Sequence, residues 1–520
     1  MSRAMRQMPA QAGRLATEGG EAAGGAVRDE AQGPHHGHRA TGPGAPAAAA
    51  GSLLEAALAR ENLQRAWKRV KANKGAAGVD GLDIEQTRLW LTTHWPEVRQ
   101  MLLQGRYRPK PVRRVMIPKA DGSQRELGIP TVLDRLIQQA LLQVLQPIID
   151  ATFSDHSHGF RPGRRAHDAV RQARGYVQSG RRVVVDVDLE KFFDRVNHDI
   201  LMERLGRRIA DAAVLRLVRA YLDAGIMADG VVIERHEGAP QGGPLSPLLA
   251  NVLLDEVDRE LERRGHCFVR YADDCNVYVR SRRAGERVMA LLRRLYGRLK
   301  LRINEAKSAV ADALAEERKF LGFAFYATKG EARCKVASKP LQAFKRRIRQ
   351  LTRRTVGRSM EQAIEALRNY LLGWKAYFGL AQSRTVWREL DEWLRHRLRA
   401  IHLKQWRRGS TIYSALRALG ASEATARRVA ANSHCWWRNS AGDINKVLTI
   451  AYFDRLGLPR LSLPQTLEPP GADPHAGWCG RGSRYDSGSP IPMCAQHGRT
   501  PRGASPRPSW PQRGKRSATA

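Results

Sequence analysis

The stretch 267–279, CFVRYADDCNVYV, constrains the fold more than any other part of the chain. Two short runs rich in apolar residues flank a polar turn, which is the pattern of a β-hairpin. Both runs are apolar enough to be buried in a sheet, and the turn carries Asp273 and Asp274. Adjacent carboxylates beside a buried sheet repel each other unless cations neutralise them. The pattern therefore predicts a buried hairpin with a cation-binding tip, although paired acids on an exposed turn are common without any such role.

A second acidic position lies in the stretch 181–194, RRVVVDVDLEKFFD. Its three valines and the Asp/Val alternation predict a buried strand, and Asp188 falls where this strand ends. A carboxylate at a strand terminus can face a cleft. The same position also suits a helix N-cap, because a helical-looking stretch follows. Asp186, two residues earlier, is the rival candidate for the same role.

Carboxylates from separate strands are what a two-metal nucleotidyl transfer site needs. Mg2+ suits carboxylate and triphosphate oxygens together. One ion activates the primer 3′-hydroxyl, and a second, roughly 3.5–4 Å away, steadies the leaving pyrophosphate. Asp188 and Asp273 could supply the ligands for such a pair.

A glycine-rich loop at 238–247, GAPQGGPLSP, precedes an expected helix. Ser246 is a good N-cap, and Pro247 suits the first helical position. Glycines let backbone approach a ligand closely, although an ordinary loop with a well-made helix start would look the same.

A further hairpin is expected from strands at 112–118 and 124–127, joined at Asp121-Gly122. Lys119 and Arg125 flank its turn and could converge on one triphosphate. A solvated, charged hairpin explains these residues equally well.

The chain divides by composition into five segments. Residues 1–50 and 457–520 lack hydrophobic periodicity and are expected to be disordered. Residues 51–110 are helical in pattern, 111–338 mix strands and helices, and 339–456 are purely helical. Mixed elements followed by a helical block predict an α+β domain with an appended α domain.

The helical block is strongly basic. Residues 339–408 hold 18 Lys/Arg against 5 Asp/Glu. The first helix has an apolar stripe, and cations fill the rest of its surface: Lys345, Arg346, Arg347, Arg349, Arg353 and Arg354. A solvated basic face is the alternative to RNA binding. Trp374 and Trp387 fall on apolar stripes, so we expect them in the core.

Charge over the whole chain favours a polyanionic partner. The 88 Lys+Arg outnumber the 51 Asp+Glu and give a formal charge of +37. No apolar run approaches the roughly 18 residues needed to cross a bilayer, so no membrane partner is expected. The 6 cysteines form no C-x-x-C pair, and a cytoplasmic location is the default expectation.

Together these motifs resemble the reverse transcriptases encoded by bacterial group II introns. Tyr271-Ala272-Asp273-Asp274 matches the family's YADD, and DLEKFFD at 188–194 resembles its first metal-binding strand. PQGGPLSP at 240–247 matches the loop bordering the nascent base pair. Further blocks follow the family order, at 159–164, 301–308 and 320–323.

The resemblance implies an α+β right-hand polymerase with fingers and palm, followed by an α-helical thumb and maturase region. It implies that Asp188, Asp273 and Asp274 are the catalytic residues and hold two Mg2+ ions. Phe193 would exclude a ribose 2′-hydroxyl and so select dNTPs. The implied nucleotide-binding residues are Lys119, Arg125, Phe193, Gln241 and Lys307. Arg161 and Arg164 would contact the template, and the basic helix at 345–354 would contact intron RNA.

The implied function is RNA-directed DNA polymerase of a mobile group II intron that also assists splicing of the intron RNA. The implied partners are that RNA, an RNA template with a DNA primer, dNTPs and a DNA target. No endonuclease is expected, because His434-Cys435 stands alone and the tail's His475, Cys479, Cys494 and His497 lack a C-x-x-C pair. Two alternatives remain: a reverse transcriptase of a defence or diversity-generating system, and a non-enzymatic splicing factor on a polymerase scaffold.

Overall fold

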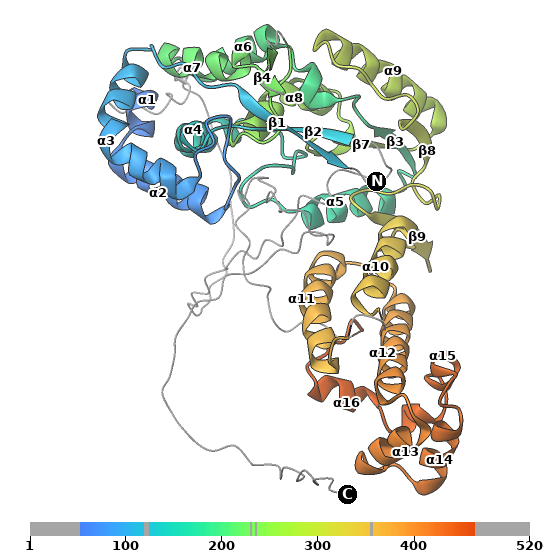
Figure 1. Cartoon of the computed structure of the whole chain (residues 1–520). Coiled ribbons are helices and arrows are strands. Elements are labelled where there is room, and N and C mark those ends of the chain that lie inside the picture. The colour runs from blue at the N-terminus through green and yellow to red at the C-terminus, as the bar shows by residue number, and fades with distance from the viewer. Residues whose placement is uncertain (1–51, 119–123, 229–230, 234–236, 354–356, 463–520) are drawn as a thin grey trace, which may run out of the picture. The chain divides into compact units, whose positions relative to one another are not determined.

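The computed structural model describes residues 52–118, 124–228, 231–233, 237–353 and 357–462 (Figure 1). The expected disordered segment 1–50 lies outside these residues, as does most of the expected tail. Within the described residues, no helix is long and apolar enough to cross a membrane.

Three N-terminal helices pack around a long fourth one. These are α1 (Leu53–Ala57), α2 (Arg60–Ala72) and α3 (Ile84–Leu103), packed against α4 (Val132–Asp150). Capping boxes at Ser52 and Asp83 begin α1 and α3. The expectation of helices in this region is confirmed.

The first sheet has the strand order β2-β1-β4-β5. Its strands are β1 (Val112–Pro118), β2 (Gln124–Ile129), β4 (Ile226–Ala228) and β5 (Val231–Ile233). β1 and β2 pair in antiparallel fashion, which confirms the expected hairpin. Its turn, which includes Lys119, lies outside the described residues.

The second sheet has the order β6-β7-β3-β8 and is antiparallel throughout. Its strands are β3 (Val183–Val187), β6 (Cys267–Tyr271), β7 (Asp274–Val279) and β8 (Ala309–Asp312). Side chains alternate across a strand, so Val183, Val185 and Val187 face one side of this sheet and Asp186 faces the other.

Different helices cover the two faces of the second sheet (Figure 1). α9 (Arg282–Arg298) packs on the valine side: a Cβ on Gly285 would lie 2.5 Å from Val310 Cγ1 and 3.5 Å from Val185 Cγ2. α8 (Ser246–Arg263) contributes to the same apolar core. α5 (Ala166–Gln178) belongs to the core on the opposite side, together with Val184.

Short helical elements connect the two sheets. They are η2 (Phe192–Arg195), α6 (His198–Gly206) and α7 (Ala212–Asp223).

The expected N-cap at Ser246 is wrong by one position. Leu245 is the N-cap of α8, and Ser246 is the first helical residue, followed by Pro247. The Ser246 hydroxyl donates instead to the carbonyl of Pro240, at 2.8 Å, and so stabilises the preceding loop.

A hairpin leads from the second sheet into the helical domain. It comprises β9 (Phe323–Thr328) and β10 (Glu331–Val336). The helical elements that follow are α10 (Ser338–Leu351), α11 (Met360–Phe378), α12 (Arg384–Trp406), α13 (Gly409–Ala418), α14 (Glu423–Ala431), α15 (Trp436–Asn439), η3 (Asp443–Lys446) and α16 (Ile450–Arg455).

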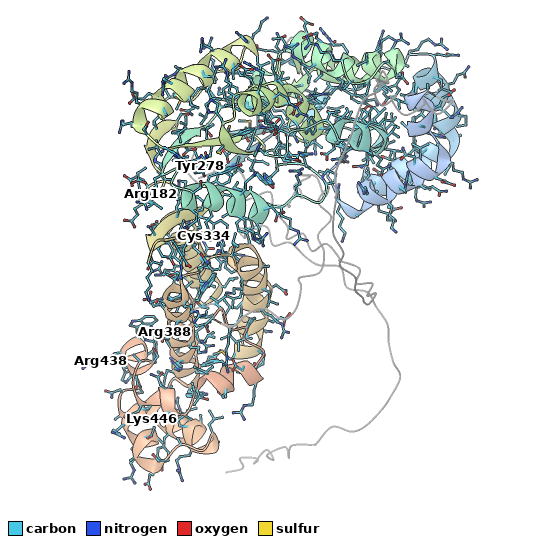
Figure 2. The ribbon with its side chains drawn as sticks, turned by 180° about the vertical axis from the view of Figure 1, so that it is seen from behind. Arg182, Tyr278, Cys334, Arg388, Arg438 and Lys446 are labelled. Atoms are coloured by element: carbon cyan, nitrogen blue, oxygen red, sulfur yellow. The ribbon has the colours of Figure 1, made fainter. Side chains whose placement is uncertain are left out.

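The expected apolar stripes form the core of this helical domain. Ser359 begins α11 with a capping box, and Trp374 and Trp387 are buried as expected. Arg388, Arg438 and Lys446 are exposed and lie successively further along the domain from Cys334 of β10 (Figure 2).

The ordered chain extends beyond the boundary expected at residue 457. Leu458 and Leu461 are buried in the helical domain. The buried carboxylate of Asp391 on α12 accepts from the backbone amides of Leu461 and Ser462, each at 2.9 Å. Residues 457–462 therefore belong to the folded domain, because they satisfy a buried anion.

Acid should destabilise the helical domain through His402. Burial lowers the pKa of this imidazole from 6.5 to about 4, and Nε2 lies 3.0 Å from the Tyr452 hydroxyl. The unfolded chain then binds a proton that the folded chain does not, so stability present above pH 6.5 is lost as pH falls towards 4. At pH 5 the loss is about 2 kcal/mol.

The measurement is the thermal midpoint of wild type and His402→Gln at pH 7.5 and pH 5. The wild type should lose more stability between the two pH values than the variant does. Equal losses would contradict this assignment.

Candidate active site

Strand register brings the predicted carboxylates to one edge of the second sheet. Val187 of β3 lies opposite Cys275 of β7, so the next residues along, Asp188 and Asp274, follow at the same end of the ladder. Asp274 also pairs with Tyr271, which leaves Ala272 and Asp273 as the two-residue turn. Residues opposite each other in a sheet have Cβ atoms about 4.5–5.5 Å apart. The hairpin tip therefore lies beside the end of β3.

The turn is held in an uncommon backbone conformation. Ala272 has φ +57°, in the left-handed region that favours glycine. Gly159 lies against it: a Cβ at residue 159 would be 2.1 Å from the Ala272 amide nitrogen. Only glycine fits at 159, because any side chain would collide with the turn.

A fully buried arginine, Arg270, is hydrogen-bonded to the same turn. The guanidinium of Arg270 pairs with both carboxylate oxygens of Asp258, with Nε at 2.9 Å from each and Nη2 2.6 Å from Oδ2. Its Nη1 donates to Asn251 Oδ1 at 2.8 Å and to the Ala272 carbonyl at 2.9 Å. Nη2 also donates to Ser157 Oγ at 2.8 Å. One side chain thus links α8 to the turn.

The segment after α9 fixes Asp188. The Asn304 amide donates to the Asp188 carbonyl at 2.8 Å, and the Asp188 amide donates to Ser308 Oγ at 3.0 Å. Lys307 Nζ lies 3.7 Å from Asp188 Oδ2. Lys307, proposed from the sequence as a nucleotide-site residue, therefore lies beside the candidate metal ligand.

Asp186 has a different environment from its rival Asp188. It lies within the β3 ladder, opposite Asn276 and Ala309, and its Oδ2 is 3.6 Å from Arg318 Nη1. Burial raises the pKa of Asp186 to about 6, against the opposing effect of Arg318. The two side chains are similarly exposed, at 28% and 32%, and what distinguishes Asp188 is its position at the strand end, beside the hairpin tip.

A second cation, Lys319, lies close to the same carboxylates. Burial lowers its pKa, and so does Lys339, while Asp186 and Asp274 act in the opposite direction. Cations from the segment that precedes β9 therefore take part in the electrostatics of this sheet edge.

Hard carboxylate oxygens at one sheet edge are the donor type that Mg2+ prefers. Among the residues that the structure describes, however, no three His, Cys, Asp or Glu side chains form a group that could hold a metal ion. The backbone brings Asp188, Asp273 and Asp274 to one place, but their carboxylates are not gathered as a ligand set. Neighbouring anions repel each other, and here Asp188 lies near Lys307.

The glycine-rich loop packs between β2 and η2. The Gly128 amide of β2 donates to the Gln241 carbonyl at 2.9 Å, and the Ala239 amide donates to the Phe193 carbonyl at 2.7 Å. Gly242 has φ +132°, and a Cβ there would lie 2.4 Å from the Gly128 carbonyl oxygen. The loop therefore joins Phe193 to the β1–β2 hairpin, the arrangement a nucleotide pocket would need.

The predicted template contact at Arg161 is wrong. This side chain is only 5% exposed, and its Nε lies 2.9 Å from Asp150 Oδ1. It also donates to the carbonyls of Ser154 and Ser157, at 2.6 and 3.0 Å. Arg161 stabilises its own loop and cannot reach a phosphate. Arg164 is less buried and pairs with Asp155 at 2.6 Å, and its contact with template stays a prediction.

The predicted RNA-binding helix is α10. Arg346, Arg349 and Arg353 are exposed along it and just after it, whereas Lys345 and Arg347 are half-buried. Arg354 lies outside the described residues, as Lys119 does. Arg125 lies opposite Ile117 in the β1–β2 ladder, and its side chain is not described.

Sequence reasoning missed the supporting residues Arg270, Ser308, Arg318 and Lys319. One signal was present: an arginine inside the apolar run CFVRY must be paired if that strand is buried. Nothing local indicated its partners.

Comparison with known proteins identifies the domains. Residues 117–325 match the family described as reverse transcriptase (RNA-dependent DNA polymerase), and residues 341–420 match the group II intron, maturase-specific domain.

Two relatives match less than half of this chain. Protein YkfC of Escherichia coli (strain K12) is 38% identical over 41% of this chain and 57% of its own length. Group II intron-encoded protein LtrA of Lactococcus lactis subsp. cremoris is 36% identical over 37% of this chain and 32% of its own. The chain thus covers about half or less of these relatives. A chain of the solved partial Cas6-RT-Cas1–Cas2 complex is 25% identical, with a TM-score of 0.32 over 48% of this chain and 43% of that chain.

The family match over residues 117–325 defines a reverse transcriptase domain, and the sequence resemblance is confirmed at this level. With the maturase-specific match following directly, the chain carries the two domains that the resemblance to group II intron-encoded reverse transcriptases implied.

Replacing Arg270 alone should destabilise the protein more than replacing both Arg270 and Asp258. Arg270→Met leaves Asp258 buried without a partner, which should lower the free energy of unfolding by about 3–5 kcal/mol. Arg270→Met combined with Asp258→Leu should recover much of that loss, because no buried charge remains. Urea unfolding followed by circular dichroism measures both. If the double variant were no more stable than the single one, the Asp258 pair would not be the main contribution of Arg270.

Proposed function

We propose that this chain is an RNA-directed DNA polymerase that extends a DNA primer on an RNA template with dNTPs. The observation that carries the proposal is the β3–β7 register, which puts Asp188 beside the turn bearing Asp273 and Asp274. The reverse transcriptase match over residues 117–325 includes all three aspartates.

The carboxylates of Asp188, Asp273 and Asp274 would hold two Mg2+ ions. When bound, such ions activate the primer 3′-hydroxyl and stabilise charge on the triphosphate. Lys307, 3.7 Å from Asp188, would bind a phosphate oxygen of the triphosphate. Arg125 and Lys119 would hold the other end of the triphosphate.

Phe193 and Gln241 would form the side of the nucleotide pocket. Both are largely buried, and the loop of Gln241 is hydrogen-bonded to the Phe193 carbonyl through Ala239. Phe193 would exclude a 2′-hydroxyl by its bulk, and Gln241 would lie beside the templating pair. Because these side chains are closely packed, the pocket could not expand to accommodate the additional oxygen atom of a ribonucleotide.

The second part of the proposal is maturase activity on intron RNA. The maturase-specific match begins at residue 341, inside α10, where exposed arginines lie on the solvent face. Folded RNA is bound largely through shape and phosphates, which suits scattered cations. The RNA would supply the splicing chemistry, and the protein would stabilise its fold. A DNA target would receive the copied intron.

Primer extension tests the polymerase proposal. Asp188→Asn, Asp273→Asn and Asp274→Asn should each lower dNTP incorporation by roughly 100-fold or more, because each removes a carboxylate that would hold the Mg2+ ions that stabilise the transition state. Chelation with EDTA should abolish extension, and Mg2+ should restore it.

Asp199→Asn is the matched control, because this aspartate is 80% exposed and pairs with Arg219 on the surface. Its activity should equal that of wild type. If Asp273→Asn extended primers normally, the site assignment would be refuted. If the wild type were inactive but bound RNA, the chain would be a splicing factor on a polymerase scaffold.

Charge reversal on α10 separates splicing from polymerisation. Arg346→Glu, Arg349→Glu and Arg353→Glu together should weaken binding to the group II intron RNA encoded around the gene, most strongly at low salt. Splicing support should fall further than extension on a short template. Arg207→Glu, Arg263→Glu and Arg264→Glu provide a control with the same net charge. An equal loss of splicing and extension would show that α10 serves only the polymerase.

A further inference from the structure

The helix that covers the back of the second sheet carries an unusual concentration of positive charge. Between residues 280 and 302 there are nine basic residues and one acidic residue, Glu286. All nine are exposed: Arg280, Arg282, Arg283, Arg287, Arg293, Arg294, Arg298, Lys300 and Arg302. We refer to α9 and these flanking residues as the α9 surface.

Four of these arginines form one continuous stripe. Arg283, Arg287, Arg294 and Arg298 are spaced by four, seven and four residues, which keeps them on one side of a helix. Their span is about 22 Å at 1.5 Å per residue. Duplex nucleic acid carries about one negative charge per 1.7 Å of its axis, so the stripe could face many phosphates at once.

These four arginines are not neutralised by the protein. None of them forms an ion pair with another residue that the structure describes, whereas Arg282 and Arg293 pair with Glu286 and Glu305. The neighbouring helix α8 is different, because its exposed arginines at 259, 263 and 264 each pair with a glutamate of the same helix. The α9 surface therefore has positive charge available for a partner.

Its position separates this surface from the candidate active site. α9 packs on the face of the sheet formed by Val183, Val185 and Val310, opposite the face on which Asp186 lies. A template bound at Asp188 and the hairpin tip would not cover the outer side of α9. Polymerisation on a simple template therefore leaves this charge unexplained.

The chemistry of the surface selects among partners. A membrane-binding helix needs an exposed apolar face, but the apolar residues of α9, such as Val288, Leu292 and Leu295, are buried against the sheet. Protein interfaces combine arginine with exposed aromatic and apolar residues, and the exposed side of α9 has no large apolar or aromatic side chain, which disfavours a protein partner. Rows of arginines suit phosphates, which they bind bidentately.

We propose that the α9 surface binds double-helical segments of RNA through their phosphates, as a second RNA contact on the side of the sheet away from the active site. This rests on the proposed function, because it concerns the RNA that the maturase would hold. A duplex on α9 would let one molecule grip folded RNA while the opposite side of the sheet remains available to template and primer.

The test compares two variants of the full chain that have the same net charge. The first carries Arg283→Gln, Arg287→Gln, Arg294→Gln and Arg298→Gln. The control carries Arg207→Gln, Arg259→Gln, Arg263→Gln and Arg264→Gln, all at exposed arginines paired with glutamates. The probe is an RNA duplex of about 20 base pairs, longer than the roughly 16 base pairs that a duplex-binding domain spans. Its affinity is measured from 50 to 200 mM salt.

Each lost phosphate contact should reduce the slope of log affinity against log salt by about 0.9, so the first variant should lose a slope of about 3 to 4. The control should keep the wild-type slope. An unchanged slope in a variant with a wild-type circular dichroism spectrum would overturn the proposal and point to a protein partner instead.

Primer extension on a short template, measured with the same variants, should be unaffected by the α9 substitutions. A wild-type chain unable to extend primers would refute the polymerase proposal and leave the binding comparison intact. Extension lost together with duplex binding in the α9 variant alone would overturn the separation of the two surfaces.

Discussion

The antiparallel register of β3 against β7 is the constraint on which the candidate site depends. A shift of one residue would turn every side chain of β3 to the opposite face, so Asp186 and Asp188 would replace the valines in the apolar layer against α9. Burying two carboxylates in an apolar layer is prohibitively costly, so the hydrophobic pattern itself selects the register. The alternation of valine and aspartate along β3 thus places the valines in the core and the aspartates on the opposite face of the sheet.

Buried polar contacts then fix the backbone conformation of the hairpin turn and of Asp188, which the strand register alone does not determine. The register places the hairpin tip beside β3 but does not determine the conformation of the turn. Arg270 does so by donating to the Ala272 carbonyl while its charge is balanced by Asp258. Ser308 and Asn304 hold the backbone of Asp188 in the same way. Polar groups in a low-dielectric interior specify geometry well, because any arrangement that leaves one unpaired is expensive.

Local patterns predicted the strands, the hairpins and the apolar stripes of the helical domain, because these depend on alternation and helical periodicity within a few residues. Roles that depend on distant partners were not predictable in the same way. Arg161 was expected to face template, yet Asp150 and nearby carbonyls hold it inside its own loop. The packing of residues 457–462 depends on Asp391, far earlier in the chain. Lys307 lies beside Asp188, but only the family resemblance indicated it, and its contact with a nucleotide stays a prediction.

The contact between Gly159 and the Ala272 turn has an evolutionary consequence. The two positions are far apart in sequence, yet the space for a Cβ at 159 is already occupied by the turn backbone. A substitution at either position would be tolerated only with a matching change at the other. Across homologues we therefore expect positions 159 and 272 to covary or to be conserved together. A glycine that touches no substrate would then come under selection as strict as that on the acidic pair it supports.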